Sequence, residues 1–506
     1  MKPAFLFLFL LISQCPFAQE GLPFGVNQQL YLKGQSTIIG NHILSTDAKK
    51  PFNEPNVIND VLKLEYIDVD NDSNTFCSSE ANLNIAKNGS SIKYAALYWS
   101  AVYKYDKGIR KELNEQLVYR GNDKRSEDVN SVLFKMPQGN YLPIDGTIVF
   151  DSFQTKLFED SKPYVCFADV TSYLQNSGSV DGTYTVANIK ATEGFVSGGA
   201  AGGWLLYVIY EDENVQPTYF TTYNGFVEVD KKPVDIVFKD FKTNEVGTIE
   251  TSLLLAALEG DQKYKSDMCA ILNTKTNTFQ PLTTKHRPEK NFFSSTITFD
   301  HEMYMDRNPN STNTLGFDLL KLKIPNTDNA IISNNSSETT IQFTTKADRF
   351  YLFFVAFETE ISPIYLEGKT DVETILVLNE ADKTDEETPE ILETTAIEVK
   401  EEIVKPITKP KSNLEKVTGL KSINIPNIPK GYYLVTNVYS VEENAKKWLS
   451  FLKDKGHDPK SYINPKNGWY YIYLKNDEDP SAIIAKRKEL SKLDYFKDIW
   501  ILKINF

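Results

Sequence analysis

The residues of this sequence that come closest to a recognisable chemistry are aromatic. The stretch NGWYYIYLKN, residues 467–476, places Trp469, Tyr471 and Tyr473 at alternate positions. Alternate side chains of a strand lie on one face of its sheet, so these three rings are predicted to share a face. Flat rings stack on the apolar faces of sugars, and tyrosine hydroxyl groups bond to sugar oxygens. The pattern therefore indicates a glycan-binding surface.

The elements around this stretch explain why it carries rings on both faces. Residues 432–440 are predicted to form a strand, 441–456 a helix, 461–475 a hairpin, 480–493 a second helix and 498–506 a last strand. In a βαββαβ unit of this kind both helices cover one face of the sheet. The residues predicted to lie under the helices are Tyr470, Ile472 and Leu474 with Leu434, Thr436 and Val438. Those predicted on the open face are Trp469, Tyr471 and Tyr473 with Tyr433 and Val435. Contiguous exposed aromatic side chains usually mark a binding surface.

The segments GYYLVTNVYSVEENAKKWLSFLKDKG, NGWYYIYL and DIWIL resemble the SPOR domain, over residues 431–506. The resemblance implies that the module binds peptidoglycan, with a preference for glycan strands stripped of their stem peptides. By position, Trp469 falls where SPOR domains often carry a ring, whereas Val435 and Tyr471 stand where many carry Gln and Arg. These departures leave fewer polar contacts, and the sequence does not decide whether the preference for stripped glycan is kept. The residues predicted to bind glycan are Tyr433, Val435, Trp469, Tyr471, Tyr473 and Trp500.

Two other interpretations of the rings stay open at this point. They could be covered by the β-rich part of the chain or by a partner, or they could stack the bases of single-stranded RNA. Residues 431–506 hold 13 Lys and Arg and 10 Asp and Glu, a net charge of only +3, and the whole chain has a net charge of −13. This balance does not favour a phosphate backbone, so no nucleic-acid partner is expected.

A second group of chemically capable residues is Asp68, Asp70 and Asp72, which alternate in YIDVDNDSNTFCSSE. Alternating acids at the start of a loop can place oxygens around Ca²⁺. An EF-hand would have Gly and Glu where this loop has Ser73 and Ser79, so the prediction is a looser calcium loop, with a solvated acidic turn as the alternative. Ca²⁺ is the one cofactor that the sequence suggests.

Motifs for catalysis are missing from the sequence. The four histidines are not paired at metal-binding spacing, and there is no G-x-S-x-G or H-E-x-x-H motif. The expectation is therefore a protein that is not an enzyme. One alternative is a peptidoglycan-remodelling hydrolase whose β-rich region is catalytic, and another is a cell-surface adhesin.

The whole chain of 506 residues divides into five predicted parts. They are a signal peptide (1–18), a β-sandwich-like domain (19–230), a second one (231–375), a charged Pro/Lys linker (376–430) and the SPOR-like domain (431–506). The predicted fold class is a mainly β N-terminal region of β-sandwich type plus a small α+β domain. The Gly-rich run SGGAAGGW precedes a strand and lacks the Lys of a phosphate loop, which favours close backbone packing or a tight turn.

The signal peptide predicts an exported protein of the periplasm or cell envelope, with the cell surface as the alternative location. Nothing after it has the length of a membrane span, so an integral membrane protein is not expected. Removal of Cys15 leaves Cys77, Cys166 and Cys269, either as one disulfide and a free thiol or as three buried thiols.

The segment EYIDVDNDSNTFCSSEANL, together with YAALYWSA, resembles a β module of the large surface adhesins of gliding Bacteroidetes. This resemblance implies an accessory of gliding motility or type IX secretion that contacts an envelope or outer-membrane protein. The partner itself, the oligomeric state and the strand topology are not set by the sequence.

Overall fold

The computed structural model describes residues 21–85, 91–121, 125–126, 128–153, 155–347, 349–366, 422–424, 428–439, 442–464, 469–477, 479–490, 492–496 and 499–505. For some residues within the elements of these ranges only the backbone is described. The predicted signal peptide and most of the predicted linker lie outside these residues. The chain divides into two compact units, residues 1–373 and 374–506, which are described separately. The first unit is built from β-sheets and the second is a small α+β unit, which confirms the predicted fold class. None of the helices among the described residues combines the length and apolarity that a bilayer crossing requires.

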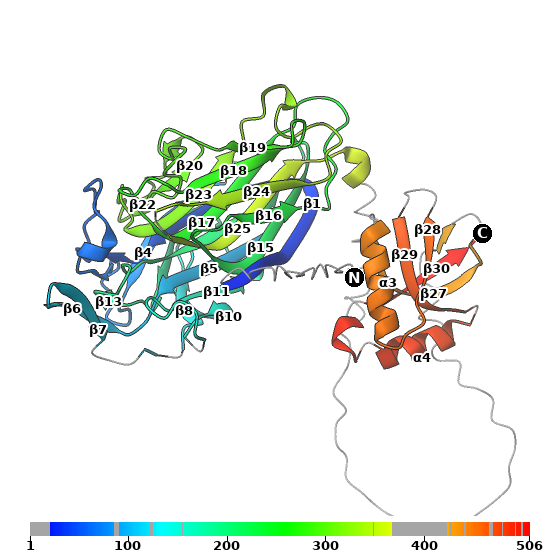
Figure 1. Cartoon of the computed structure of the whole chain (residues 1–506), viewed down its shortest axis with the longest axis horizontal. Helices are drawn as coiled ribbons and strands as arrows, with labels where there is room; N and C mark the ends of the chain where they lie inside the picture. Colours follow the sequence, from blue (N-terminus) through cyan, green and yellow to red (C-terminus); the bar gives the residue numbers. More distant parts are fainter. Residues whose placement is uncertain are drawn as a thin grey trace, which may run out of the picture. The chain divides into compact units, whose positions relative to one another are not determined.

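The largest sheet of the first unit has eleven strands (Figure 1). In spatial order they are β10 (Thr147–Asp151), β11 (Pro163–Asp169), β5 (Ile92–Val102), β14 (Gly202–Glu211), β1 (Gly21–His42), β15 (Pro217–Val229), β25 (Phe350–Glu360), β17 (Thr251–Gly260), β23 (Gly316–Lys323), β20 (Ile297–Phe299) and β21 (Glu302–Met303).

Four smaller sheets complete the first unit. One has five strands: β22 (Arg307–Asn308), β4 (Ser78–Leu83), β12 (Gly182–Ala187), β8 (Ser131–Lys135) and β9 (Tyr141–Asp145). One has four: β16 (Val234–Phe238), β24 (Thr339–Thr344), β18 (Met268–Asn273) and β19 (Thr278–Pro281). The others are β13 (Glu193–Gly194) with β6 (Lys107–Leu113) and β7 (Gln116–Gly121), and β2 (Leu44–Ser45) with β3 (Glu65–Tyr66). Short helical segments are α1 (Thr171–Gln175), η1 (Asn59–Val61) and η2 (Thr327–Asn329).

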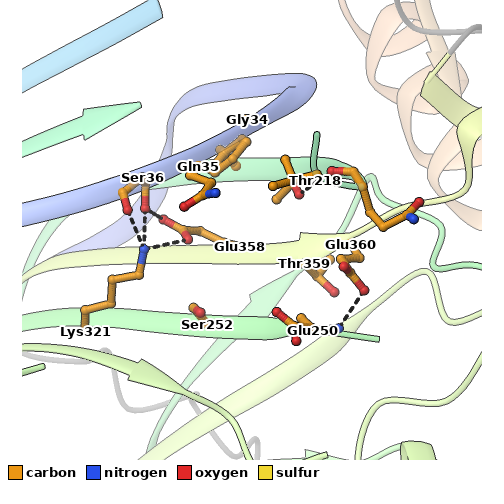
Figure 2. A pocket seen from close by; sticks show the side chains of 13 residues that line it. Gly34, Gln35, Ser36, Thr218, Glu250, Ser252, Lys321, Glu358, Thr359 and Glu360 are labelled. Carbon is orange, nitrogen blue, oxygen red and sulfur yellow. Dashed lines mark hydrogen bonds and ion pairs between the residues drawn. The ribbon is translucent and has the colours of Figure 1, made fainter. Parts of the chain in front are cut away.

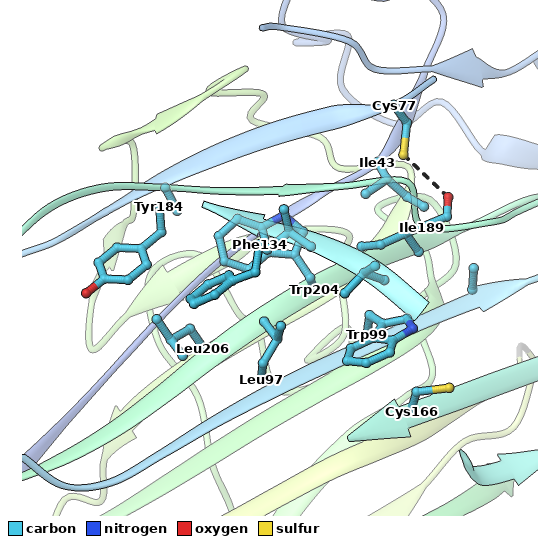
Figure 3. Close-up of a cluster of buried hydrophobic side chains, with 14 of the residues drawn as sticks. Ile43, Cys77, Leu97, Trp99, Phe134, Cys166, Tyr184, Ile189, Trp204 and Leu206 are labelled. Carbon is cyan, nitrogen blue, oxygen red and sulfur yellow. Dashed lines mark hydrogen bonds between the residues drawn. The ribbon is translucent and has the colours of Figure 1, made fainter. Parts of the chain in front are cut away.

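Strand β1 joins the two halves of the large sheet. Its first part, Gly21–Lys33, pairs with β15, and its second part, Gly34–His42, pairs with β14. The half with β14 and β5 packs on the five-stranded sheet, where Trp99, Trp204 and Leu206 meet Phe134 and Tyr184 (Figure 3). Each of these two sheets thus buries one apolar face against the other, as a sandwich requires.

The second half of the large sheet makes a second sandwich with the four-stranded sheet. Phe357 of β25 is fully buried there and stacks on Phe238 of β16, with ring centroids 4.5 Å apart. A third cluster holds the two halves of the large sheet together back to back, through contacts such as Tyr98 and Tyr207 on Phe354. The strands between these clusters are buried on both faces, which is why β5, β14 and β25 read as almost continuous apolar runs.

The two predicted sandwiches are present, but Asp230 is not a boundary between separate domains. The turn at residues 230–232 links β15 of the large sheet to β16 of the sheet packed on it, within the second sandwich. The two sandwiches share β1 and the back-to-back cluster, and residues up to 373 form one compact unit.

The Gly-rich run SGGAAGGW confirms the expectation of close backbone packing. A Cβ at Gly203 would stand 2.4 Å from the ring of Phe317, across the back-to-back interface. A residue without a side chain is required there because the facing half of the sheet comes so near.

The second unit contains a sheet with the order β26 (Ser422–Asn424), β30 (Trp500–Asn505), β27 (Gly431–Tyr439), β29 (Trp469–Asp477) and β28 (Lys460–Asn464). Its helices are α3 (Glu442–Asp454), α4 (Pro480–Leu490) and the short η3 (Asp494–Phe496). From β27 onward the element order is the predicted βαββαβ. The predicted end of the linker at residue 430 is wrong in one respect, because residues 422–424 pair in parallel with β30 and add a fifth strand.

The second sandwich offers a direct test of the packing. Replacing Phe357 by Ala deletes a fully buried ring that stacks on Phe238, so we expect the unit to lose about 3–5 kcal/mol of unfolding free energy. Val246→Ala is the control, since Val246 is 82% exposed and its loss should change stability by less than about 0.5 kcal/mol. Urea unfolding followed by tryptophan fluorescence measures both, and equal stability of the two variants would contradict the packing described.

Candidate glycan-binding face and other candidate sites

The helix-covered face of the C-terminal sheet has the side chains that the alternation predicts. Ile472 of β29 and Leu434 of β27 are fully buried in one cluster with Leu452 of α3 and Ile483 of α4. Tyr470 and Leu474 are partly buried against the same cluster. On β27, Thr436 accepts a hydrogen bond of 3.1 Å from Nε1 of Trp448, on α3.

Val438 was predicted under the helices and lies on the opposite face instead. Val435 pairs with Tyr473 but Asn437 pairs with Ile472, so Thr436 is an extra residue in β27. Such a bulge shifts the alternation by one position. After it, Tyr439 takes the helix-covered side and Val438 packs with the residues of the other face.

The face without helices carries four tyrosines, Tyr433, Tyr462, Tyr471 and Tyr473, which we call the tyrosine face. Tyr462 of β28 stacks in parallel on Tyr471, with centroids 5.0 Å apart and planes 9° apart. Tyr433 meets Tyr473 edge to face at 5.0 Å, and meets Tyr462 in the same way at 6.0 Å. The rings therefore form one connected layer on three strands.

Two of the predicted contact residues are covered by their neighbours. Tyr433 is 1% exposed and donates a 2.7 Å hydrogen bond to the carbonyl of Pro429, while Val435 is fully buried on the central strand. Both side chains are covered in this arrangement, which argues against a direct contact with glycan. Tyr471 and Tyr473 remain partly exposed. The side chains of Trp469 and Trp500 lie outside the described residues.

Tyr462 belongs to the tyrosine face but is not among the residues predicted from the sequence. It stands directly opposite Tyr471 in the β28–β29 register, a signal that the predicted hairpin could have given. Its ring is 8% exposed, and its hydroxyl group has no hydrogen-bond partner among the described residues. Burial, with a smaller contribution from Tyr471, raises its pKa, so this hydroxyl stays protonated and able to donate.

In the acidic loop of the first unit, the carboxylates of Asp68 and Asp70 accept hydrogen bonds from neighbouring protein groups. Asp70 accepts hydrogen bonds from the amide of Asp72 (2.9 Å) and the hydroxyl of Thr75 (3.0 Å), and a further one from the hydroxyl of Tyr141. Burial acts to raise the pKa of Asp70, but these donors outweigh it and the pKa is lowered. Asp68 accepts from Ser78 at 3.0 Å. No group of three or more metal-ligating side chains occurs among the described residues, and the calcium loop stays a prediction.

The three cysteines that follow the predicted signal peptide are buried free thiols. Of the two alternatives left open by the sequence, three buried thiols is the one present. Burial raises the pKa of Cys77 to about 12, so this thiol is protonated and unreactive at neutral pH.

A polar pocket of about 250 Å³ opens where β1, β15, β17, β23 and β25 meet (Figure 2). At its base Glu358 accepts a 2.8 Å hydrogen bond from Tyr207 and another from Ser36, and it pairs with Lys321 at 3.3 Å. Nζ of Lys321 also donates to the hydroxyl of Ser36 at 2.8 Å. These four residues come from four strands and satisfy one another, which is what a structural ion-pair network requires.

Comparison with known proteins does not assign this chain to a family. No family model matches the sequence, and no curated protein does. Among solved structures, the wild-type glycoside hydrolase BuGH86 in complex with neoagarooctaose aligns at a TM-score of 0.18 and 10% identity, over 53% of this chain and 32% of its own. The major capsid protein P2 of bacteriophage PM2 aligns at a TM-score of 0.16 and 8% identity, over 65% of this chain and 99% of its own. The alignment spans about a third of the hydrolase chain. At these TM-scores neither likeness carries an argument about function.

Calcium binding by the acidic loop is testable by melting. An ion shared by Asp68, Asp70 and Asp72 would offset their mutual repulsion, so the first unit should melt at a lower temperature in chelator. Asp70→Ala should abolish the difference. Identical melting with and without Ca²⁺ would rule the site out.

His42 provides a pH test of the first unit. Its ring is fully buried, with Nδ1 2.9 Å from the carbonyl of Leu44 and Nε2 3.0 Å from the hydroxyl of Ser311. Burial, helped by the charge of Arg307, lowers its pKa from 6.5 to about 3. Between these values the unfolded chain binds a proton that the folded chain does not, so the stability present above pH 6.5 is lost as the pH falls toward 3.

We expect His42→Gln to reduce the dependence of unfolding free energy on pH in that window, by up to about 1.4 kcal/mol per pH unit. Urea unfolding at several pH values gives the slope. The control is His301→Gln, at an exposed histidine. A wild-type slope in the His42 variant would contradict the assignment of a neutral buried ring.

Proposed function

We propose that this protein is an exported, non-enzymatic component of the cell envelope that binds peptidoglycan glycan strands through its C-terminal unit. The observation that carries the proposal is the tyrosine face: a connected layer of rings on the side of the sheet opposite both helices, with Tyr471 and Tyr473 partly exposed. Stacking of rings on sugar faces needs an apolar plane with polar edges, and tyrosines supply both.

In this proposal the four tyrosines have three roles. Tyr471 and Tyr473 contact the glycan, with Trp469 of the same strand as a further predicted contact. Tyr433 and Val435 form the floor on which these rings rest. Tyr462 holds the plane of Tyr471 by stacking.

The first unit has the complementary role of contacting a protein of the envelope or outer membrane. The resemblance of its sequence to adhesin modules supports a place beside the gliding or type IX secretion machinery.

Pelleting with purified sacculi tests the proposal. The full chain should sediment with sacculi, and a chain lacking residues 422–506 should stay in solution. Release of soluble glycan fragments would establish the hydrolase alternative. Cleavage of the protein by external protease on intact cells would place it at the surface as an adhesin.

Substitutions on the two faces of β29 test the face itself. Tyr473→Ala and Trp469→Ala each remove a ring, and by analogy with base stacking each should cost on the order of 1–3 kcal/mol of sacculus binding. Ile472→Ala removes a fully buried side chain and should destabilise the unit by about 2–5 kcal/mol.

The matched control is Tyr173→Ala, at a tyrosine that is 38% exposed on α1 of the first unit. It should change neither binding nor melting. Full sacculus binding by both ring variants would show that the tyrosine face does not hold the glycan.

A further inference from the structure

A pocket of about 440 Å³ in the first unit lies on loops at one end of the second sandwich. Its walls come from the segment before η1, the β17–β18 loop, the β19–β20 loop and the residues around β21 and β22. The lining is mostly amide, hydroxyl and basic side chains: Asn53, Asn56, Gln262, Lys265, Lys285, His286, Asn291, Ser294, Thr296 and Thr312, with Pro55, Pro288 and Met303. Its volume is that of a small-ligand site.

The charge of this amide-rich pocket is opposite to that of the protein. Three basic side chains line it, and none of its lining residues is Asp or Glu, although the chain as a whole has a net charge of −13. Lys265 and the ring of His286 have no ion-pair or hydrogen-bond partner among the described residues. Lys285 lies 3.9 Å from Glu302, but both side chains are more than two-thirds exposed, so this pair is weak. The pocket therefore favours an anion.

The polar walls are held in place before any ligand arrives. Gln262 donates to the carbonyl of Thr312 (3.1 Å) and accepts from the amide of Asn56 (3.2 Å). Asn53 accepts from the amide and the hydroxyl of Thr312, at 2.8 and 3.0 Å. These bonds tie three of the four walls together, and a preformed site loses less entropy on binding.

A buried ion pair anchors the fourth wall. Arg287 is 1% exposed and donates to Asp318 at 2.8 Å, and to the carbonyls of Phe292 and Thr296, both at 2.7 Å. Asp318 in turn accepts the amide of Ser294 at 3.1 Å. The loop that carries His286, Asn291 and Ser294 is thus fixed to β23.

One buried polar atom of the pocket lacks a hydrogen-bond partner among the described residues. Asn291 is 5% exposed and donates through Nδ2 to the carbonyl of Gln262 at 3.0 Å, but its Oδ1 has no partner among the described residues. A buried acceptor without a donor costs free energy, which a ligand hydroxyl or N–H group would recover. The ligand should therefore carry donors as well as negative charge.

We propose that this amide-rich pocket binds an acidic saccharide, its carboxylate held by Lys265, Lys285 and His286. Hydroxyl groups of the sugar bond to the amides of the walls and to Oδ1 of Asn291, and its C–H face rests on Pro55, Pro288 and Met303. This site lies in the first unit and is independent of the glycan proposed for the tyrosine face.

The experiment is calorimetry on the full chain with a trimer of galacturonic acid, and with the neutral galactose trimer of the same length. We expect the acidic trimer to bind and the neutral one to bind at least about tenfold more weakly, the effect of losing one charge-assisted hydrogen bond. Lys265→Ala combined with His286→Ala should lower the affinity for the acidic trimer by at least about tenfold and leave melting unchanged. The matched control is Lys111→Ala, an exposed lysine on β6 that does not line the pocket.

Four results would overturn the proposal. They are no binding of the acidic trimer, equal binding of the neutral trimer, unchanged binding in the double variant, or tighter binding of a tripeptide with a free C-terminal carboxylate. The last would keep the anion and replace the saccharide. Since the chain lacking residues 422–506 retains the pocket, binding of the trimer by that chain separates this result from the outcome of the sacculus experiment.

Discussion

The architecture of the first unit depends on the double pairing of one strand. The first part of β1 pairs with β15 and its second part pairs with β14, so a single sheet continues from one sandwich into the other. Because the two halves then face each other through an aromatic cluster, the strands of the centre have no solvent face. A polar side chain in this centre needs partners from the neighbouring strands, as Glu358 has in Ser36, Tyr207 and Lys321.

Polar side chains without buried partners can gather at the ends of the sandwiches, where loops leave the sheets. The amide-rich pocket is an example, since its basic residues stand on loops while Arg287 and Asp318 beneath them are buried in the framework. A buried pair of this kind is not strong evidence of stability, because desolvation offsets most of the attraction. Its clearer effect is geometric. Five hydrogen bonds from one guanidinium and three backbone amides on one carboxylate fix the course of the β19–β20 loop.

The second unit buries the two faces of its sheet in different ways. One face buries Ile472 and Leu434 under α3 and α4, and the other buries Tyr433 and Val435 beneath tyrosine rings rather than beneath another layer of structure. The rings thus act as both core and surface. Tyr471 and Tyr473 remain partly exposed because the sheet has nothing else to cover them among the described residues. A face of this construction is consistent with an extended ligand laid across the strands.

Local pattern was enough to determine the fold class, the βαββαβ order and the two faces of β29, because side-chain alternation and helical spacing are properties of the chain itself. Pattern also marked Trp469, Tyr471 and Tyr473, but it could not separate a ring at the surface from one beneath it. Whether Tyr433 is covered depends on Pro429 and on Tyr462 of another strand, and whether Val438 faces the helices depends on a bulge at Thr436. The joining of the two sandwiches by β1 and the gathering of Lys265, His286 and Asn291 in one pocket were equally invisible. Each brings together residues far apart in the sequence, and only tertiary packing decides which distant residues meet.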